Sequence, residues 1–281
     1  MKLSTLISPE QLAAQLGAPD LLVLDCRFEL SNPASGGQDY AQAHLPGAVY
    51  ADLDRDLSNL SKTGLGRHPL PDASAFSAVL SRWGWTPATR VVAYDDAGGA
   101  LAAARLWWML RLVGAREVAV LDGGFKAWRE AGLPLETVVS QRVPTQVQVE
   151  FDAAQIVYTD ALRQLGDAAM LLDARGAARF RGEVEPIDPV AGHVPGARNR
   201  PLTDNFDARG RYKSADALRA EFGVSLGTRK ASEVVHMCGS GVSACANLLA
   251  MEHAGLTGSR LYAPSWSGWI SDPSRPIAKG E

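Results

Sequence analysis

One short loop carries the side chain best suited to chemistry in this sequence. Cys238 lies in the stretch "VHMCGSGVSACANLL", between an apolar run and a helix-like segment. Gly239 and Gly241 allow the chain to curl, so that several N–H groups and the helix dipole favour an anion at one point. A thiolate is such an anion and is the nucleophilic form of cysteine. The pattern predicts a nucleophile whose persulfide the same groups would hold; the alternative is an inert, buried thiol.

Other roles for the cysteines find less support. A cysteine-dependent phosphatase needs an arginine six residues after the nucleophile, where this chain has Ala244. A cysteine hydrolase needs a histidine beside the thiol; it stays open, although no local signature predicts it. His236 is expected inside a strand, and three cysteines without a CxxC pair fit neither a disulfide framework nor a zinc site. We therefore expect no metal or cofactor and interpret Cys245 and Cys26 as packing residues, with a redox role left open.

The composition is that of an ordinary globular chain. It has 281 residues, 46% of them hydrophobic and 21% charged, and a formal charge of -3 without a long block of either sign. These values argue against nucleic acid or a membrane as the main partner. The N-terminal "SPEQL" predicts a helix start with Ser8 as N-cap and Pro9 in the first turn, rather than a signal peptide. No apolar run approaches ~20 residues, so we expect a cytoplasmic protein.

Four sequence blocks recur in the same order in both halves of the chain. At separations of 148, 149, 143 and 141 residues they pair Arg27 with Arg175, His44 with His193, Asp95 with Cys238, and Trp128 with Trp269. This period is too long for a solenoid repeat of ~20–50 residues. It predicts a duplicated domain, with an N-terminal domain at 1–135, an extended linker at 136–150 and a C-terminal domain at 151–281.

Short apolar runs alternate with helical patterns within each half. Runs such as Leu21–Leu24, Val91–Tyr94 and Val118–Leu121 have the length and β-branched content of buried strands. The alternation predicts an α/β fold in each half, a parallel sheet flanked by helices on both faces. Sites in such sheets lie at the carboxyl ends of strands, which is where Cys238 falls.

The duplicated position makes a purely structural role for Cys238 less plausible. A core position would carry apolar residues in both copies, but the first half has Asp95 there. We therefore expect an active C-terminal domain and a catalytically inactive N-terminal one. Residues that occur in both copies are expected to hold the fold instead: Asp25, Arg27, Asp173, Arg175, His44 and His193.

Over essentially its whole length the chain resembles the rhodanese superfamily of sulfurtransferases. The resemblance is carried by the tandem domains, the "LLDAR" and "GHVPGA" blocks, and the cysteine loop of the second half. The loop "CGSGVS" is similar to the "CGSGVT" of 3-mercaptopyruvate sulfurtransferases, with Ser243 in place of threonine. Thiosulfate enzymes of this architecture typically have "CRKGVT". The uncharged Gly239 and Ser240 favour a donor with less negative charge than the thiosulfate dianion.

This resemblance implies a reaction in two halves. Cys238 would take a sulfur atom from 3-mercaptopyruvate as a persulfide, then pass it to a thiol, cyanide or a thioredoxin-like protein acceptor in a ping-pong mechanism. The persulfide would lie against the N–H groups of residues 239–244, which include Gly239, Gly241, Val242, Ser243 and Ala244. Thiosulfate is the alternative donor. A persulfide carrier that uses no small-molecule donor is the second alternative.

The resemblance also implies further site residues. Arg179 would bind the carboxylate of the donor, and Asp54, His68 and Ser240 would form a proton relay. Without the resemblance, Arg179 is an exposed helix arginine and His68 a loop residue. A second arginine, usual before the "GH" block, is missing from the acidic "GEVEPIDPVAGH". The sequence leaves open whether a substitute exists among Arg67, Arg181, Arg198 and Arg200.

Overall fold

The computed structural model describes residue 3 and residues 5–281, which form two units. The first unit holds the chain up to Asn59, Leu70–Asp152 and Arg209–Tyr212. The second unit holds Leu60–Pro69, Ala153–Ala208 and Lys213–Glu281. Residues 60–69 thus pack with the second unit although they belong to the first sequence repeat.

The first unit alternates strands and helices from Leu6 onward. In chain order its elements are β1 (Leu6–Ile7), α1 (Pro9–Ala13), β2 (Leu21–Asp25), α2 (Ser35–Gln42), β3 (Val49–Tyr50), α3 (Ala73–Arg82), β4 (Arg90–Tyr94), α4 (Ala102–Leu112), β5 (Val118–Leu121) and α5 (Gly124–Glu130). The expected cap of α1 is confirmed, since the Ser8 side chain accepts a hydrogen bond from Gln11 N and Pro9 opens the helix.

The second unit repeats this order with four added 3₁₀ turns among its described residues. Its strands are β6 (Ile156–Val157), β7 (Met170–Asp173), β8 (Arg198–Asn199), β9 (Val234–Met237) and β10 (Arg260–Tyr262). Its helices are α6 (Thr159–Leu165), α7 (Ala177–Phe180), α8 (Ala215–Leu226), α9 (Ala244–His253) and α10 (Ser265–Trp269). The 3₁₀ turns are η1 (Ala153–Gln155), η2 (Gly166–Ala168), η3 (Leu202–Asn205) and η4 (Ala231–Glu233).

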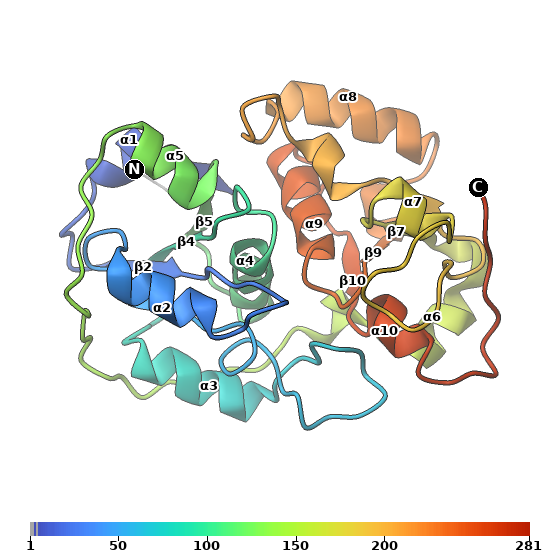
Figure 1. The fold of residues 1–281 in the computed structure, drawn as a ribbon, viewed down its shortest axis with the longest axis horizontal. Coiled ribbons are helices and arrows are strands. Elements are labelled where there is room, and N and C mark those ends of the chain that lie inside the picture. Colours follow the sequence, from blue (N-terminus) through green and yellow to red (C-terminus); the bar gives the residue numbers. More distant parts are fainter. Residues whose placement is uncertain (1–2, 4) are drawn as a thin grey trace. The chain divides into compact units, whose positions relative to one another are not determined.

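Each unit is built around one parallel sheet. Among the described residues, the strand order is β1-β5-β4-β2-β3 in the first sheet and β6-β10-β9-β7-β8 in the second, with every pair parallel. The two orders correspond strand for strand, so β4 and β9 occupy the same place. The α/β fold with tandem parallel sheets is confirmed (Figure 1).

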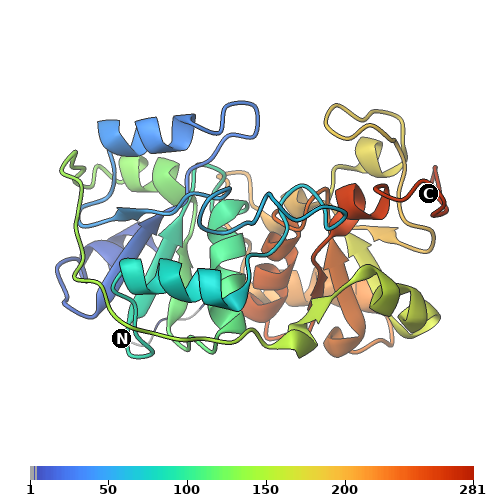
Figure 2. The same ribbon diagram turned by 90° about the horizontal axis from the view of Figure 1, so that it is seen from below.

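Helices cover both faces of the first sheet. One face packs its alternate side chains against Leu12 of α1, Tyr40 of α2 and Trp128 of α5, all of them buried. Helix α4 packs on β4 and β5, and Figure 2 shows α2 and α3 on opposite sides of this sheet. In the second unit, α6 and α10 contribute to the core cluster on one face, and α9 packs on β9 and β10.

The segment after α5 runs in extended conformation along the first unit. Glu136 forms an antiparallel bridge with His44. Further on, Thr145 N donates to Ser81 O at 2.9 Å and Val149 N donates to Ser77 Oγ at 3.0 Å, which ties the segment to α3. No helix in the described part of the chain is long and apolar enough to cross a membrane.

Candidate active site

Cys238 lies at the carboxyl end of β9, the middle strand of the second sheet. The strand has β10 on one side and β7 on the other. The chain leaves the sheet at Cys238, forms a loop, and enters α9 at Ala244. Open parallel sheets bind ligands at this edge, where loops connect strands to helices. Only 1% of Cys238 is exposed, so its sulfur is largely desolvated.

The loop directs a backbone N–H at the sulfur. Gly241 N donates to Cys238 Sγ at 3.2 Å, and Gly241 has φ +75°, a value that favours glycine. Cys238 N donates to Ser265 Oγ at 3.1 Å, and Ser265 has φ +52°, which is unusual for a residue with a side chain. Trp266 N donates to Cys238 O at 3.0 Å. These two bonds from the start of α10 hold the backbone of Cys238 in place.

The other loop residues predicted to contact the persulfide lie between Cys238 and the first turn of α9. Val242 and Ala244 are buried, and Ser243 stands at the N-cap position of α9. The oxygen of Gly239 accepts a hydrogen bond from Ser267 N at 2.8 Å. Cys245 is fully buried, and its Sγ donates to Gly241 O at 3.5 Å, which fits its interpretation as a packing residue.

His68 and Ser240 meet beside this loop within the second unit. His68 Nδ1 and Ser240 Oγ share a hydrogen bond of 2.8 Å, and both residues are buried. The segment that carries His68 is anchored one residue earlier, where Arg67 N donates to Ser267 Oγ at 2.9 Å. The backbone is also close at Gly66, where a Cβ would lie 2.4 Å from Pro264 O. The structure thus brings together two of the three residues of the expected relay.

Asp54, the third residue of that relay, belongs to the first unit. Its N–H donates to Asp52 Oδ1 at 2.9 Å. Burial, together with the neighbouring Asp52 carboxylate, raises the pKa of Asp54. Its position next to Ser240 stays a prediction.

Arg179 lies in the short helix α7 and is held by two carboxylates. Its Nη2 atom lies 2.7 Å from Glu185 Oε1 and 3.1 Å from Asp188 Oδ2. Burial opposes ionisation of Glu185, but the hydrogen bond from Arg179 and those from Asp188 N and Ile187 N outweigh it and lower the pKa of Glu185. The Arg179 side chain is 19% exposed, so its guanidinium is oriented while still reached by solvent.

Arg67 emerges as the second arginine beside the cysteine loop. A Cβ on Gly239 would lie 3.2 Å from Arg67 Nη2 and 3.7 Å from Arg179 Nη2. Arg181 instead pairs with Glu183 in an exposed position, and Arg200 is buried against Asn205. Of the four arginines that the sequence left open, the structure thus places Arg67 against Gly239.

Sequence reasoning missed the two carboxylates that hold these arginines. Glu185 and Asp188 both come from the acidic segment before the "GH" block, in which the sequence showed only a missing arginine. The signal that could have revealed them is their spacing, since Glu185 and Asp188 follow Arg179 by six and nine residues and can fold back onto its guanidinium.

The corresponding loop of the first unit holds a carboxylate in place of the thiol. Asp95 Oδ1 accepts hydrogen bonds from Ala97 N and Gly99 N at 2.9 and 2.8 Å. Its Oδ2 accepts from Leu101 N and Ala103 N at 3.0 and 3.1 Å. The N–H groups of this loop therefore converge on the Asp95 carboxylate, at the position where the sequence predicts N–H groups around Cys238.

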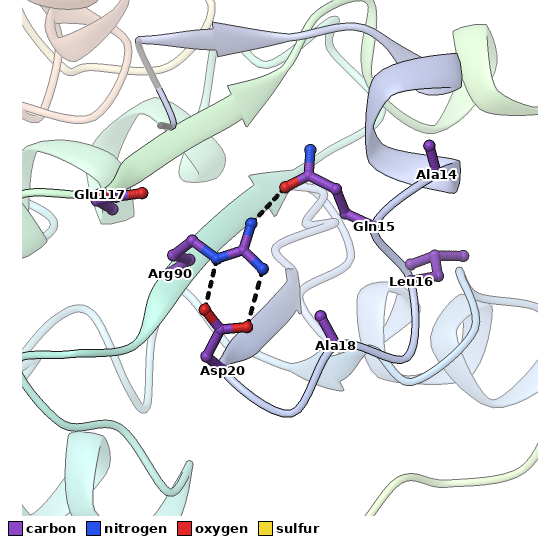
Figure 3. A pocket seen from close by; sticks show the side chains of 7 residues that line it. All are labelled: Ala14, Gln15, Leu16, Ala18, Asp20, Arg90 and Glu117. Atoms are coloured by element: carbon purple, nitrogen blue, oxygen red, sulfur yellow. Dashed lines mark hydrogen bonds and ion pairs between the residues drawn. The ribbon is translucent and has the colours of Figure 1, made fainter. Parts of the chain in front are cut away.

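Two hollows are lined by residues of the first unit. One, of about 280 Å³, is lined by Asp95 and by the fully buried Cys26. The other lies at the amino end of β4 (Figure 3). There the guanidinium of Arg90 binds both oxygens of Asp20, at 2.7 and 2.8 Å, and also contacts Gln15. The charge of Arg90 is thus already matched by Asp20, which indicates a structural pair.

The residues repeated in both halves form equivalent internal bonds. Arg27 Nη2 donates to Asp25 Oδ2 at 2.7 Å, and Arg175 Nη2 donates to Asp173 Oδ2 at 2.8 Å. All four are buried, and so are His44 and His193, whose Nδ1 atoms each donate to a backbone oxygen at 2.6 and 2.8 Å. Such bonds fasten the loops after β2 and β7 to the sheets. The described residues contain no group of three or more His, Cys, Asp or Glu that could hold a metal ion.

Comparison with known proteins identifies the family. The family described as "Rhodanese-like domain" matches residues 8–131 and 158–272, and the chain belongs to it. A Pseudomonas aeruginosa protein named a probable 3-mercaptopyruvate sulfurtransferase is 49% identical over 285 residues and 100% of both chains. A Mycobacterium tuberculosis protein provisionally named a thiosulfate sulfurtransferase is 40% identical, over 98% of this chain and 97% of its own.

Solved structures agree in fold. The structure of a 3-mercaptopyruvate sulfurtransferase from Leishmania major superposes with a TM-score of 0.81 at 32% sequence identity. The match covers 94% of this chain and 73% of that one.

Proposed function

We propose that this chain is a sulfurtransferase that moves a sulfur atom from 3-mercaptopyruvate to an acceptor through a persulfide on Cys238. The observation that carries the proposal is that Cys238 lies at the carboxyl end of β9, with a loop N–H donating to its sulfur and an arginine pair beside Gly239. The relatives named for 3-mercaptopyruvate, at 49% and 34% identity, support the same donor.

In the first half-reaction the Cys238 thiolate attacks the sulfur of the donor. An S–S bond forms, the C–S bond of mercaptopyruvate breaks, and its electron pair passes to the carbon as the enolate of pyruvate. The enolate then needs a proton. His68 and Ser240, joined at 2.8 Å, are positioned to deliver it through the serine hydroxyl, with Asp54 as the proposed third member. Arg179 would bind the carboxylate of the donor and hold its sulfur in line with Cys238.

In the second half-reaction an acceptor thiolate attacks the outer persulfide sulfur. The S–S bond breaks, the acceptor leaves with the sulfur, and Cys238 returns as a thiolate; with cyanide the product is thiocyanate. The charge of the outer sulfur must be stabilised between these steps. Asp95 supports this role for the loop, because its carboxylate accepts four backbone N–H bonds at the same place of the first unit. That carboxylate also leaves the first unit without a nucleophile there.

The reaction through a free thiol also bears on the sulfur acceptor and on the location of the protein. The acceptors we propose are small thiols, cyanide or a thioredoxin-like protein thiol. All three cysteines are free thiols, as this mechanism requires of Cys238, and we propose a cytoplasmic, reducing location.

The proposal is tested by turnover with both donors. The value of kcat/KM for 3-mercaptopyruvate should exceed that for thiosulfate, and Cys238→Ser should abolish both activities. Cys245→Ala serves as the matched control and should retain them. Full activity in Cys238→Ser, or hydrolysis without a persulfide, would refute the assignment.

A further inference from the structure

The two arginines beside the cysteine loop share one buried carboxylate. Asp188 Oδ1 lies 2.6 Å from Arg67 Nη1, and its Oδ2 lies 3.1 Å from Arg179 Nη2. The Asp188 side chain is only 2% exposed, whereas those of Arg67 and Arg179 are 26% and 19% exposed. One carboxylate thus bridges two guanidinium groups whose outer parts still face solvent.

The Asp188 carboxylate, which bridges the two arginines, lies next to Gly239, the residue after Cys238. A Cβ on Gly239 would be 3.7 Å from Asp188 Oδ2, close to the two guanidinium groups already described. The negative charge of Asp188 therefore lies where the anionic end of a donor would bind. Any donor that uses these arginines also meets this carboxylate.

The charges of the cluster cancel. Arg67 and Arg179 contribute two positive charges, and Asp188 and Glu185 contribute two negative ones at hydrogen-bond distance. Glu185 also lies 3.4 Å from Arg175, whose positive charge is matched by its own partner Asp173. Arg67 Nη2 and Arg179 Nη1 make no hydrogen bond among the described residues, so both arginines keep N–H donors for a planar carboxylate. The site therefore offers geometry for a carboxylate but little net positive charge for a dianion.

We infer that Asp188 is a specificity-determining residue, which positions Arg67 and Arg179 and disfavours dianionic donors relative to monoanionic ones. This inference rests on the proposed function, because it concerns the donor of the same reaction. Mercaptopyruvate presents one carboxylate, whereas thiosulfate carries two negative charges. An extra negative charge near this buried carboxylate lowers affinity by about tenfold or more.

Donor binding without turnover tests the inference directly. We would measure Kd for thiosulfate and for 3-mercaptopyruvate by titration calorimetry in a Cys238→Ser background, which cannot accept sulfur. Adding Asp188→Asn should lower the ratio of Kd for thiosulfate to Kd for mercaptopyruvate by about tenfold. Adding Arg67→Gln removes a positive charge instead and should raise that ratio. Glu183→Gln, which removes a charge from an exposed pair with Arg181, should leave it unchanged.

The outcomes separate this inference from the proposed function. A ratio that changes by less than about twofold in Asp188→Asn overturns the role of Asp188, whatever Arg67→Gln does. If Asp188→Asn does not fold, Asp188→Ser removes the same charge and the same criterion applies. If the ratio of the two Kd values changes as expected but the protein with Cys238 intact shows no turnover with either donor, the proposed function is refuted. The role of Asp188 in charge preference is supported in that case.

Discussion

His236 gives a prediction whose magnitude follows from its surroundings. It lies on β9, two residues before Cys238, and is fully buried. Neither of its ring nitrogens has a hydrogen-bond partner among the described residues. Burial, followed by the charge of nearby Arg200, lowers the pKa of His236 to about 3. The folded protein therefore holds a neutral imidazole at any pH near neutrality.

The consequence for stability has a definite sign. In the unfolded chain a histidine has a pKa of about 6.5, so below that pH the unfolded state binds a proton that the folded state does not. Stability from this residue is fully present above pH ~6.5 and is lost as the pH falls toward about 3. At ~1.4 kcal/mol per pH unit, the loss at pH 5 is about 2 kcal/mol.

Urea unfolding at pH 7 and pH 5 measures this term. The wild type should lose about 2 kcal/mol more than His236→Leu between these two pH values, because the variant cannot titrate and removes no hydrogen bond. Other titrating groups are common to both proteins and cancel in the comparison. His253→Gln is a useful reference, since burial lowers the pKa of this half-buried residue in the same direction. Equal losses in wild type and His236→Leu would show that the imidazole is solvated or charged in the folded protein.

Two further predictions concern the paired loops. Asp95→Ala should lower the unfolding free energy by about 3 kcal/mol in urea titrations, because it removes the acceptor of four backbone N–H groups, two of them in buried residues. Asp95→Asn should show a smaller loss, and a change below about 1 kcal/mol in Asp95→Ala would contradict the anion-holding loop. Ser240→Ala should lower kcat with 3-mercaptopyruvate by about 100-fold or more while sparing thiosulfate, whose sulfite product needs no carbon-bound proton. Recovery in Ser240→Thr would support the hydroxyl as the group involved, and equal losses with both donors would refute the relay.

The sequence predicts the fold well because its signals are local and occur twice. Alternating apolar runs and helices, together with the correspondence of Asp95 with Cys238, lead to two equivalent sheets, and β4 and β9 end immediately before these two residues. The loop chemistry of Cys238 was visible for the same reason. The positive φ of Ser265 was not, because this residue bonds with the distant Cys238, and no pattern in its own segment indicates that contact.

The arginine cluster shows where sequence reasoning stops. Arg67 and Asp188 are far apart in the chain, yet their side chains meet at 2.6 Å. The sequence showed an acidic segment that lacks an expected arginine, but not that its carboxylates hold an arginine from residues 60–69. Pairing between distant charges depends on how that segment packs against the second unit, which no local spacing encodes.

The central claim is that Cys238 accepts the sulfur atom of the donor, and mass spectrometry tests it most directly. The protein would be incubated with 3-mercaptopyruvate in the absence of an acceptor, then digested under non-reducing conditions. We predict a gain of one sulfur atom on the peptide that contains Cys238, in step with the pyruvate released, and its loss on addition of cyanide. Pyruvate release with no added sulfur on Cys238, or sulfur found on Cys245 or Cys26 instead, would contradict the mechanism.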